Sequence, residues 1–135
     1  MILIPIAPGE LLDRISILDI KLARITDAAK RANVAHEHAV LSEARAGGIP
    51  ASAECDALFE LLSAVNLKLW NVEDALRDHE RDARFDVGFI ALARSVYVLN
   101  DERAALKKAI NLLLGSDIVE EKSYASYAPA ASTSS

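Results

Sequence analysis

Apolar residues recur at alternating steps of four and three along three separate stretches of this chain. In the second stretch they are Leu58, Leu62, Val65, Leu69, Val72 and Leu76. Because an α-helix has 3.6 residues per turn, this spacing gathers the apolar side chains on one face of a helix. The same spacing runs from Leu11 to Ala32 and from Phe89 to Leu113. The chain is therefore expected to fold as long amphipathic helices that pack side by side.

Residues that start or stop helices divide the chain at regular intervals. Starting signals are a proline in a first turn and polar caps, and stopping signals are glycines with a proline shortly after them: Pro8, Gly47, Gly48, Pro50, Ser52, Asp86 and Gly115. They predict helices over about 8–46, 53–83 and 87–114. We predict an all-α, antiparallel three-helix bundle with long helices, a single domain over 1–127, and a disordered C-terminal tail over 128–135.

Composition narrows the classes of function. The 135 residues are 52% hydrophobic and carry a net charge of −5 without a basic cluster, which argues against nucleic-acid binding. The lone Cys55 fits a reducing compartment, and the opening MILIPIAP is too short to span a bilayer. We therefore expect a cytoplasmic protein that uses no membrane, and no motif in the sequence predicts a cofactor.

The first predicted helix carries a second apolar face. Ile17 and Ile20 project roughly opposite the stripe that runs from Leu11 to Ile25. In a three-helix bundle one of these faces would stand in water, so it needs a cover. We predict that a second copy of the chain covers it, as a homodimer with Ile17 and Ile20 in the interface. The MILIPI segment and the C-terminal tail are the alternative covers.

Arg103 interrupts the apolar stripe of the third predicted helix. A buried guanidinium needs a carboxylate or carbonyl partner, and the helix over 53–83 offers acidic residues beside its stripe. The residues that flank the two stripes form a candidate ligand site: Trp70, Glu73, Arg77, Arg94, Tyr97, Asp101 and Arg103. One interpretation is a pocket for a small anionic or sugar-like ligand. The other is an ionic network that fixes the register of the helices.

Paired acidic residues on helices also raise the question of a metal site. Glu73, Asp74 and Asp101 resemble the acidic residues with which helical nucleotide pyrophosphohydrolases bind magnesium. The repeated Glu-x-x-Glu pattern of those enzymes is missing here. We therefore predict no metal site.

The run RISILDIKL, from Arg14 to Leu22, is similar to the long first helix of the all-helical chorismate mutases. Those enzymes hold a dicarboxylate with cationic side chains from that helix. The matching positions here are Leu12, Ala29 and Val40, none of which is a cation. The resemblance therefore implies a shared helix pattern without the activity.

A second resemblance covers most of the chain, through PGELLDRISILDIK, LWNVEDALRDHE, FIALARSVYVLNDERAALKKAIN and EEKSYASY. These stretches look like an uncharacterised family of short bacterial helical proteins that is associated with surface polysaccharide genes. The resemblance implies a link to surface glycan synthesis and supplies no catalytic residues. We predict an interaction or accessory protein that works with a protein partner. A small-molecule binder or enzyme that uses the candidate ligand site is the alternative. Tyr124 and Tyr127 are expected to pack back on the bundle.

Overall fold

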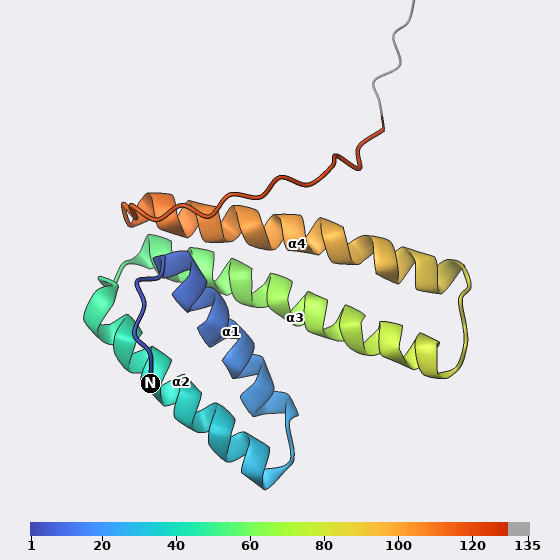
Figure 1. Cartoon of the computed structure of the whole chain (residues 1–135), viewed down its shortest axis with the longest axis horizontal. Coiled ribbons are helices and arrows are strands. Elements are labelled where there is room, and N and C mark those ends of the chain that lie inside the picture. The colour runs from blue at the N-terminus through green and yellow to red at the C-terminus, as the bar shows by residue number, and fades with distance from the viewer. Residues whose placement is uncertain (130–135) are drawn as a thin grey trace, which may run out of the picture.

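A computed structural model describes residues 1–129 and contains four helices in that range, without a strand. They are α1 (Pro8–Arg24), α2 (Ala28–Gly48), α3 (Ala53–Arg81) and α4 (Val87–Leu113). Figure 1 shows α3 and α4 as a long antiparallel hairpin, with α1 and α2 on one side of it. The all-α prediction is confirmed. Most of the predicted disordered tail, residues 130–135, lies outside the described residues.

The predicted first helix over 8–46 is wrong, because the chain breaks at residues 25–27 and reverses. Ile25 and Asp27 adopt extended backbone conformations, and the Asp27 side chain caps α2 by accepting a hydrogen bond from the Lys30 N–H at 2.9 Å. The Arg31 guanidinium donates to the Leu22 and Ile25 carbonyls at the end of α1. These contacts satisfy backbone groups at both helix ends, so the three-helix count becomes four.

The other helix starts lie where the sequence predicts them. α1 begins at Pro8, the Ser52 hydroxyl accepts the Cys55 N–H at 3.0 Å, and the Asp86 carboxylate accepts the Phe89 N–H at 3.0 Å. Gly115 ends α4 with a φ of +64°, a conformation that favours glycine. A proline in the first turn and two side-chain caps therefore mark three of the four helix starts in the sequence.

α1 is the central helix of the fold. It packs against α2 on one side and against both α3 and α4 on the other. Leu11, Ile15 and Leu18 are buried on one face, and Leu12 is fully buried on the other, in a core cluster with Cys55, Leu62 and Ile110. Helices of the same chain thus lie against both apolar faces of α1. Ile20 is buried and Ile17 is half-buried beside α3.

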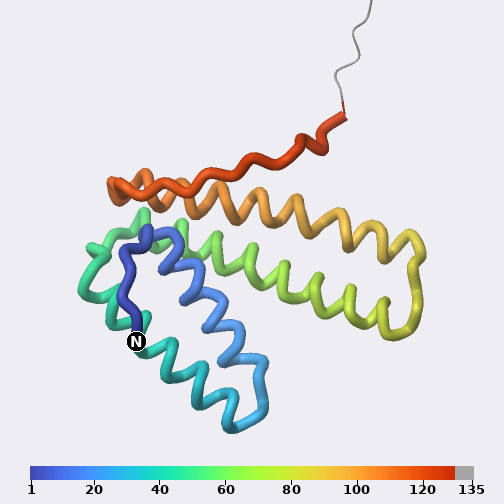
Figure 2. The backbone as a smooth tube through the Cα atoms, viewed as in Figure 1, coloured from blue at the N-terminus to red at the C-terminus, as the bar shows by residue number. Residues whose placement is uncertain are grey.

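The α3–α4 hairpin extends well beyond α1 and α2, as Figure 2 shows. We call residues 69–98, which form the far half of this hairpin, the arm. The arm ends in the loop between α3 and α4, where the Phe85 ring packs edge-on against Phe89 with 5.3 Å between ring centroids. No third helix accompanies the arm within the described chain.

Residues after α4 lie along that helix without forming another one. Glu120 lies 3.5 Å from the Lys107 ammonium, and the Tyr127 ring packs on Tyr97 with 5.0 Å between centroids. Tyr124 stays largely exposed. None of the four helices combines the length and apolar character that crossing a bilayer requires.

Candidate functional site

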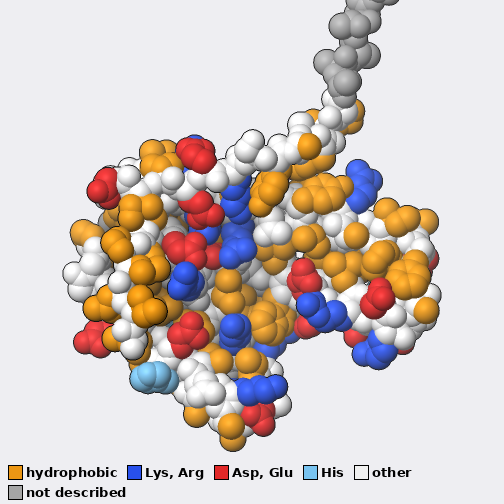
Figure 3. Space-filling model, in the orientation of Figure 1, with side chains coloured by type: hydrophobic (Ala, Val, Ile, Leu, Met, Phe, Trp, Pro, Cys, Tyr) orange, Lys and Arg blue, Asp and Glu red, His pale blue; other side chains and the backbone are white. Residues whose placement is uncertain are grey.

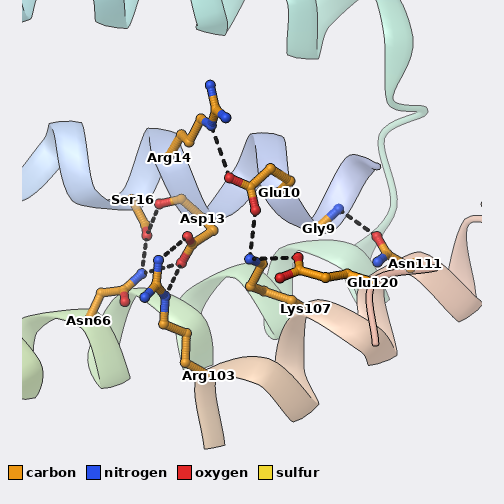
Figure 4. A network of polar contacts seen from close by, with 10 residues as sticks. All are labelled: Gly9, Glu10, Asp13, Arg14, Ser16, Asn66, Arg103, Lys107, Asn111 and Glu120. Atoms are coloured by element: carbon orange, nitrogen blue, oxygen red, sulfur yellow. Dashed lines mark hydrogen bonds and ion pairs between the residues drawn. The ribbon is translucent and has the colours of Figure 1, made fainter. Parts of the chain in front are cut away.

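A network of polar side chains joins the start of α1 to α3 and α4 (Figure 4). Its first contact is at Gly9, whose N–H donates to the Asn111 side-chain carbonyl at 2.7 Å. A Cβ at position 9 would overlap the Lys107 carbonyl oxygen, at a separation that real Cβ atoms do not show. Glycine at this position therefore lets the two helices approach closely.

Asp13 is the centre of the network and is 1% exposed. The Arg103 guanidinium donates to both of its carboxylate oxygens, from Nε at 2.8 Å and from Nη2 at 2.5 Å. The Asn66 amide donates to Asp13 at 2.9 Å and to the Ser16 hydroxyl at 2.7 Å. This two-point ion pair with an added amide donor satisfies a carboxylate that would be costly to bury alone.

The protonation of Asp13 follows from these contacts. Burial by itself raises the pKa of its carboxyl, but the hydrogen bonds from Arg103 and Asn66 outweigh burial and hold the pKa below its usual value. The hydrogen bond to Asp13 in turn raises the pKa of Arg103. Both groups are charged at neutral pH, so the pair is an ion pair.

Glu10 forms the outer part of the network. Its carboxylate accepts hydrogen bonds from Lys107 at 2.6 Å and from Arg14 at 3.0 Å. Burial raises the pKa of Glu10, and these two hydrogen bonds more than reverse that effect. Lys107 therefore lies between Glu10 of α1 and Glu120 of the C-terminal segment.

The sequence predicts a carboxylate partner for Arg103, and the structure supplies one from α1 in place of the expected helix over 53–83. Gly9, Asp13 and Ser16 were not singled out in the sequence. A sequence pattern could have identified the α1 residues of this network. Gly9, Asp13, Ser16 and Ile20 are spaced by steps of three and four, which places them on one face of a helix.

A cavity of about 560 Å³ lies between α1 and the base of the arm, and we call it the notch. Figure 3 shows this hollow between the part of the molecule that contains α1 and α2 and the protruding arm. Its walls combine apolar and charged side chains: Ile17, Ile20, Asn66, Leu69, Trp70, Glu73, Asp74, Arg77, Asn100 and Arg103. Glu73 and Arg77 pair with each other at 2.7 Å.

The seven candidate ligand residues do not come together at one site. Trp70, Glu73, Arg77 and Arg103 line the notch. Tyr97 and Asp101 line a different cavity of about 1020 Å³, between α4 and the C-terminal segment. A hydrogen bond to Asp101 raises the pKa of the Tyr127 hydroxyl there. Arg94 is exposed and lines neither cavity.

The three acidic residues considered as metal ligands do not lie together. Glu73 and Asp74 line the notch, whereas Asp101 lines the cavity beside the C-terminal segment. Among residues 1–129 no group of three or more histidines, cysteines or carboxylates could hold a metal ion. Leu12, at a position where chorismate mutases carry a cation, is fully buried in the core.

The arm differs from the rest of the structure in burial. From Leu67 to Val98 no residue is buried, although the helices there are regular. The side chains that continue the apolar stripes are only half-buried: Leu69, Val72, Leu76, Phe89, Leu92 and Val96. At the tip, Phe85 is 56% exposed. The arm therefore leaves the apolar stripes of α3 and α4 only partly covered.

Comparison with known proteins gives one match. A family model described as a family of unknown function (DUF6165) matches residues 2–135. No curated protein and no solved structure matches the chain. Because the family model covers nearly all of the sequence, the chain belongs to this family of unknown function.

Proposed function

We propose that this chain is a small protein-interaction module that assembles through its arm, in the first place with a second copy of itself. The observation that carries the proposal is the absence of any buried residue from Leu67 to Val98. Two helices alone bury too little apolar surface to hold long amphipathic stripes away from water. A partner packed against the arm completes that burial.

The base of the hairpin shows how a third helix covers α3 and α4. There α1 contacts Asn66 and Arg103, and Leu12, Leu62 and Ile110 form a buried cluster. Farther along, α3 and α4 continue side by side without a third helix (Figure 1). A helical partner that packs there would bury the half-exposed stripes, at roughly 25 cal/mol for each Å² of apolar surface.

A second candidate function is binding of a small molecule in the notch. Its volume of about 560 Å³ and the side chain of Trp70 favour this function. The charged side chains in the notch argue against binding of an anionic ligand. Arg103 is paired with Asp13 and Arg77 with Glu73, so both cations that line the notch already have carboxylate partners. An anionic ligand would have to displace one of them.

The predicted role in surface glycan synthesis and the predicted cytoplasmic location stay predictions. They concern the pathway and the cellular compartment of the protein. The assembly itself is a property of the purified chain and can be measured directly.

Sedimentation velocity over a range of concentrations tests the proposal. We expect a monomer–dimer equilibrium that Phe85→Ser shifts toward monomer, because Phe85 is an exposed apolar side chain at the tip of the arm. Leu61→Ser is the matched control, since Leu61 is 55% exposed on α3 but lies outside the arm. A chain that sediments as a monomer at every concentration would contradict the proposal, and so would equal weakening by both substitutions.

A further inference from the structure

Residues 117–129 follow α4 and run back beside it, as Figure 2 shows, and we call them the strap. We propose that the strap is autoinhibitory: closed on α4 it covers part of the arm, and open it leaves that part free for a partner. This inference rests on the proposed function and adds its regulation.

The end of α4 directs the strap back along the same helix. Gly115 has a φ of +64°, and its N–H donates to the Leu112 carbonyl at 3.3 Å. The N–H of Ser116 donates to the Asn111 carbonyl at 2.9 Å. These two hydrogen bonds form a Schellman motif, which satisfies the last carbonyls of a helix and reverses the chain. The strap therefore begins beside α4.

Ion pairs hold the first part of the strap. Glu120 lies 3.5 Å from the Lys107 ammonium, and Glu121 lies 3.9 Å from the Lys108 ammonium. Both glutamates are more than half exposed, and ion pairs of this kind are weak and screened by salt. Lys107 also binds Glu10, at 2.6 Å. Release of Glu120 therefore leaves Lys107 paired.

An aromatic pair holds the far part of the strap. The Tyr127 ring packs on Tyr97 with 5.0 Å between ring centroids. The Tyr127 hydroxyl donates a hydrogen bond to Asp101, which raises the pKa of that hydroxyl. Tyr97 belongs to the arm, so this contact places the strap on the arm.

The strap packs loosely on α4. Every residue over 117–129 is exposed. A cavity of about 1020 Å³ separates the strap from Ala93, Val96 and Ala104 of α4, whereas well-packed interiors have few voids larger than a water molecule. Ordering an extended segment costs conformational entropy, which such contacts offset only in part. The open and closed forms of the strap are therefore close in free energy.

The strap covers a surface that the proposed function uses. Ala93, Val96 and Tyr97 line the cavity under the strap and also belong to the arm. Val96 continues the apolar stripe of α4 and is half-buried. A partner packed over Val96 would need the space that the closed strap takes. Because only the open form then accepts a partner, the closed fraction lowers the apparent affinity of the arm.

Sedimentation velocity on variants of the whole chain tests this regulation. Tyr127→Ala removes the ring that holds the strap on Tyr97, so we expect the dissociation constant of the dimer to fall by about fivefold or more. Tyr124→Ala is the matched control, because Tyr124 lies on the same strap and is 79% exposed. We expect it to change the dissociation constant by less than about twofold.

A distance measurement follows the strap itself. Spin labels on Ser123→Cys and Glu102→Cys mark the strap and α4, and the natural Cys55 is buried. The labelled protein is diluted with unlabelled chain, so that electron–electron resonance reports distances within one copy. We expect a short distance at low salt, and a longer and broader distribution at high salt or when Tyr127→Ala is added.

The outcomes separate this inference from the proposed function. Equal dissociation constants for the natural chain and Tyr127→Ala would overturn the autoinhibitory role and leave the interaction module intact. A label distance that neither salt nor Tyr127→Ala changes would also overturn the inference, because the strap would then not open. If the natural chain and Tyr127→Ala are both monomers at every concentration, the proposed function fails and this inference fails with it.

Discussion

Arg103 of α4 donates hydrogen bonds to both carboxylate oxygens of Asp13 in α1, across a separation of 90 residues in the sequence. This contact fixes α1 against the hairpin. Arg103 also lines the notch, together with Ile17 and Ile20 of the same helix as Asp13. The ion pair is therefore a structural element that also forms part of the wall of the notch.

Removal of Arg103 should destabilise the fold strongly. Arg103→Met leaves the Asp13 carboxylate buried without its main partner, and breaking a buried pair in this way costs about 3–5 kcal/mol. Arg77→Met removes an exposed ion pair with Glu73 and should cost less than about 1 kcal/mol. Urea unfolding of the two variants measures the difference. Equal losses of unfolding free energy in the two variants would show that the buried ion pair contributes no more to stability than the exposed pair does.

The pH dependence of stability should depend on Asp13. Its pKa in the folded chain lies below the value of about 3.9 for an unfolded aspartate, so its contribution is present above that value and is lost as the pH falls through the folded pKa. Asp13→Asn lacks this contribution. The gap in unfolding free energy between the natural chain and Asp13→Asn should therefore narrow from about pH 6 to about pH 3. A constant gap would contradict this assignment.

Glycine should be required at position 9 but not at position 47. Gly9→Ala places a Cβ against the Lys107 carbonyl and should cost about 1–3 kcal/mol through overpacking. Gly47 lies in a helix with no atom near its added Cβ, so Gly47→Ala should stabilise the chain by about 0.5–1 kcal/mol. Thermal unfolding compares the two variants. A neutral Gly9→Ala would mean that α1 can move away from α4 at little cost.

The regular features of the fold can be predicted from the sequence. Apolar spacing and capping residues give the class, the bounds of α3 and α4 to within a few residues, and the start of α1 at Pro8. These features depend on contacts within a few residues of each other. The need for a carboxylate near Arg103 also follows from a single residue, because burial of a charge requires a partner.

The break between α1 and α2 could not be predicted from spacing alone. Ala29 and Ala32 continue the steps of four and three, although they belong to another helix. Asp27 followed by Lys30 was the available signal, since aspartate caps helices. The identity of Asp13 as the partner and the division of the candidate residues between two cavities depend on how the helices cross, which a single sequence does not specify.

Small ligands should have little effect on the natural chain. Because the cations that line the notch are paired, we expect no shift of the thermal midpoint with nucleotides, nucleotide sugars, small dicarboxylates or divalent metals. A reproducible shift that Trp70→Phe weakens would favour the second candidate function. Differential scanning fluorimetry makes this comparison.

The most direct test of the docking surface uses the only tryptophan of the chain, Trp70, which lines the notch. Acrylamide quenching of its fluorescence is measured as the concentration of the purified protein rises. If a second copy packs against the arm, which includes Trp70, quenching should fall as the dimer forms, and Phe85→Ser should delay the change to higher concentration. Quenching that stays constant while sedimentation shows a dimer would contradict the claim that the chain assembles through its arm.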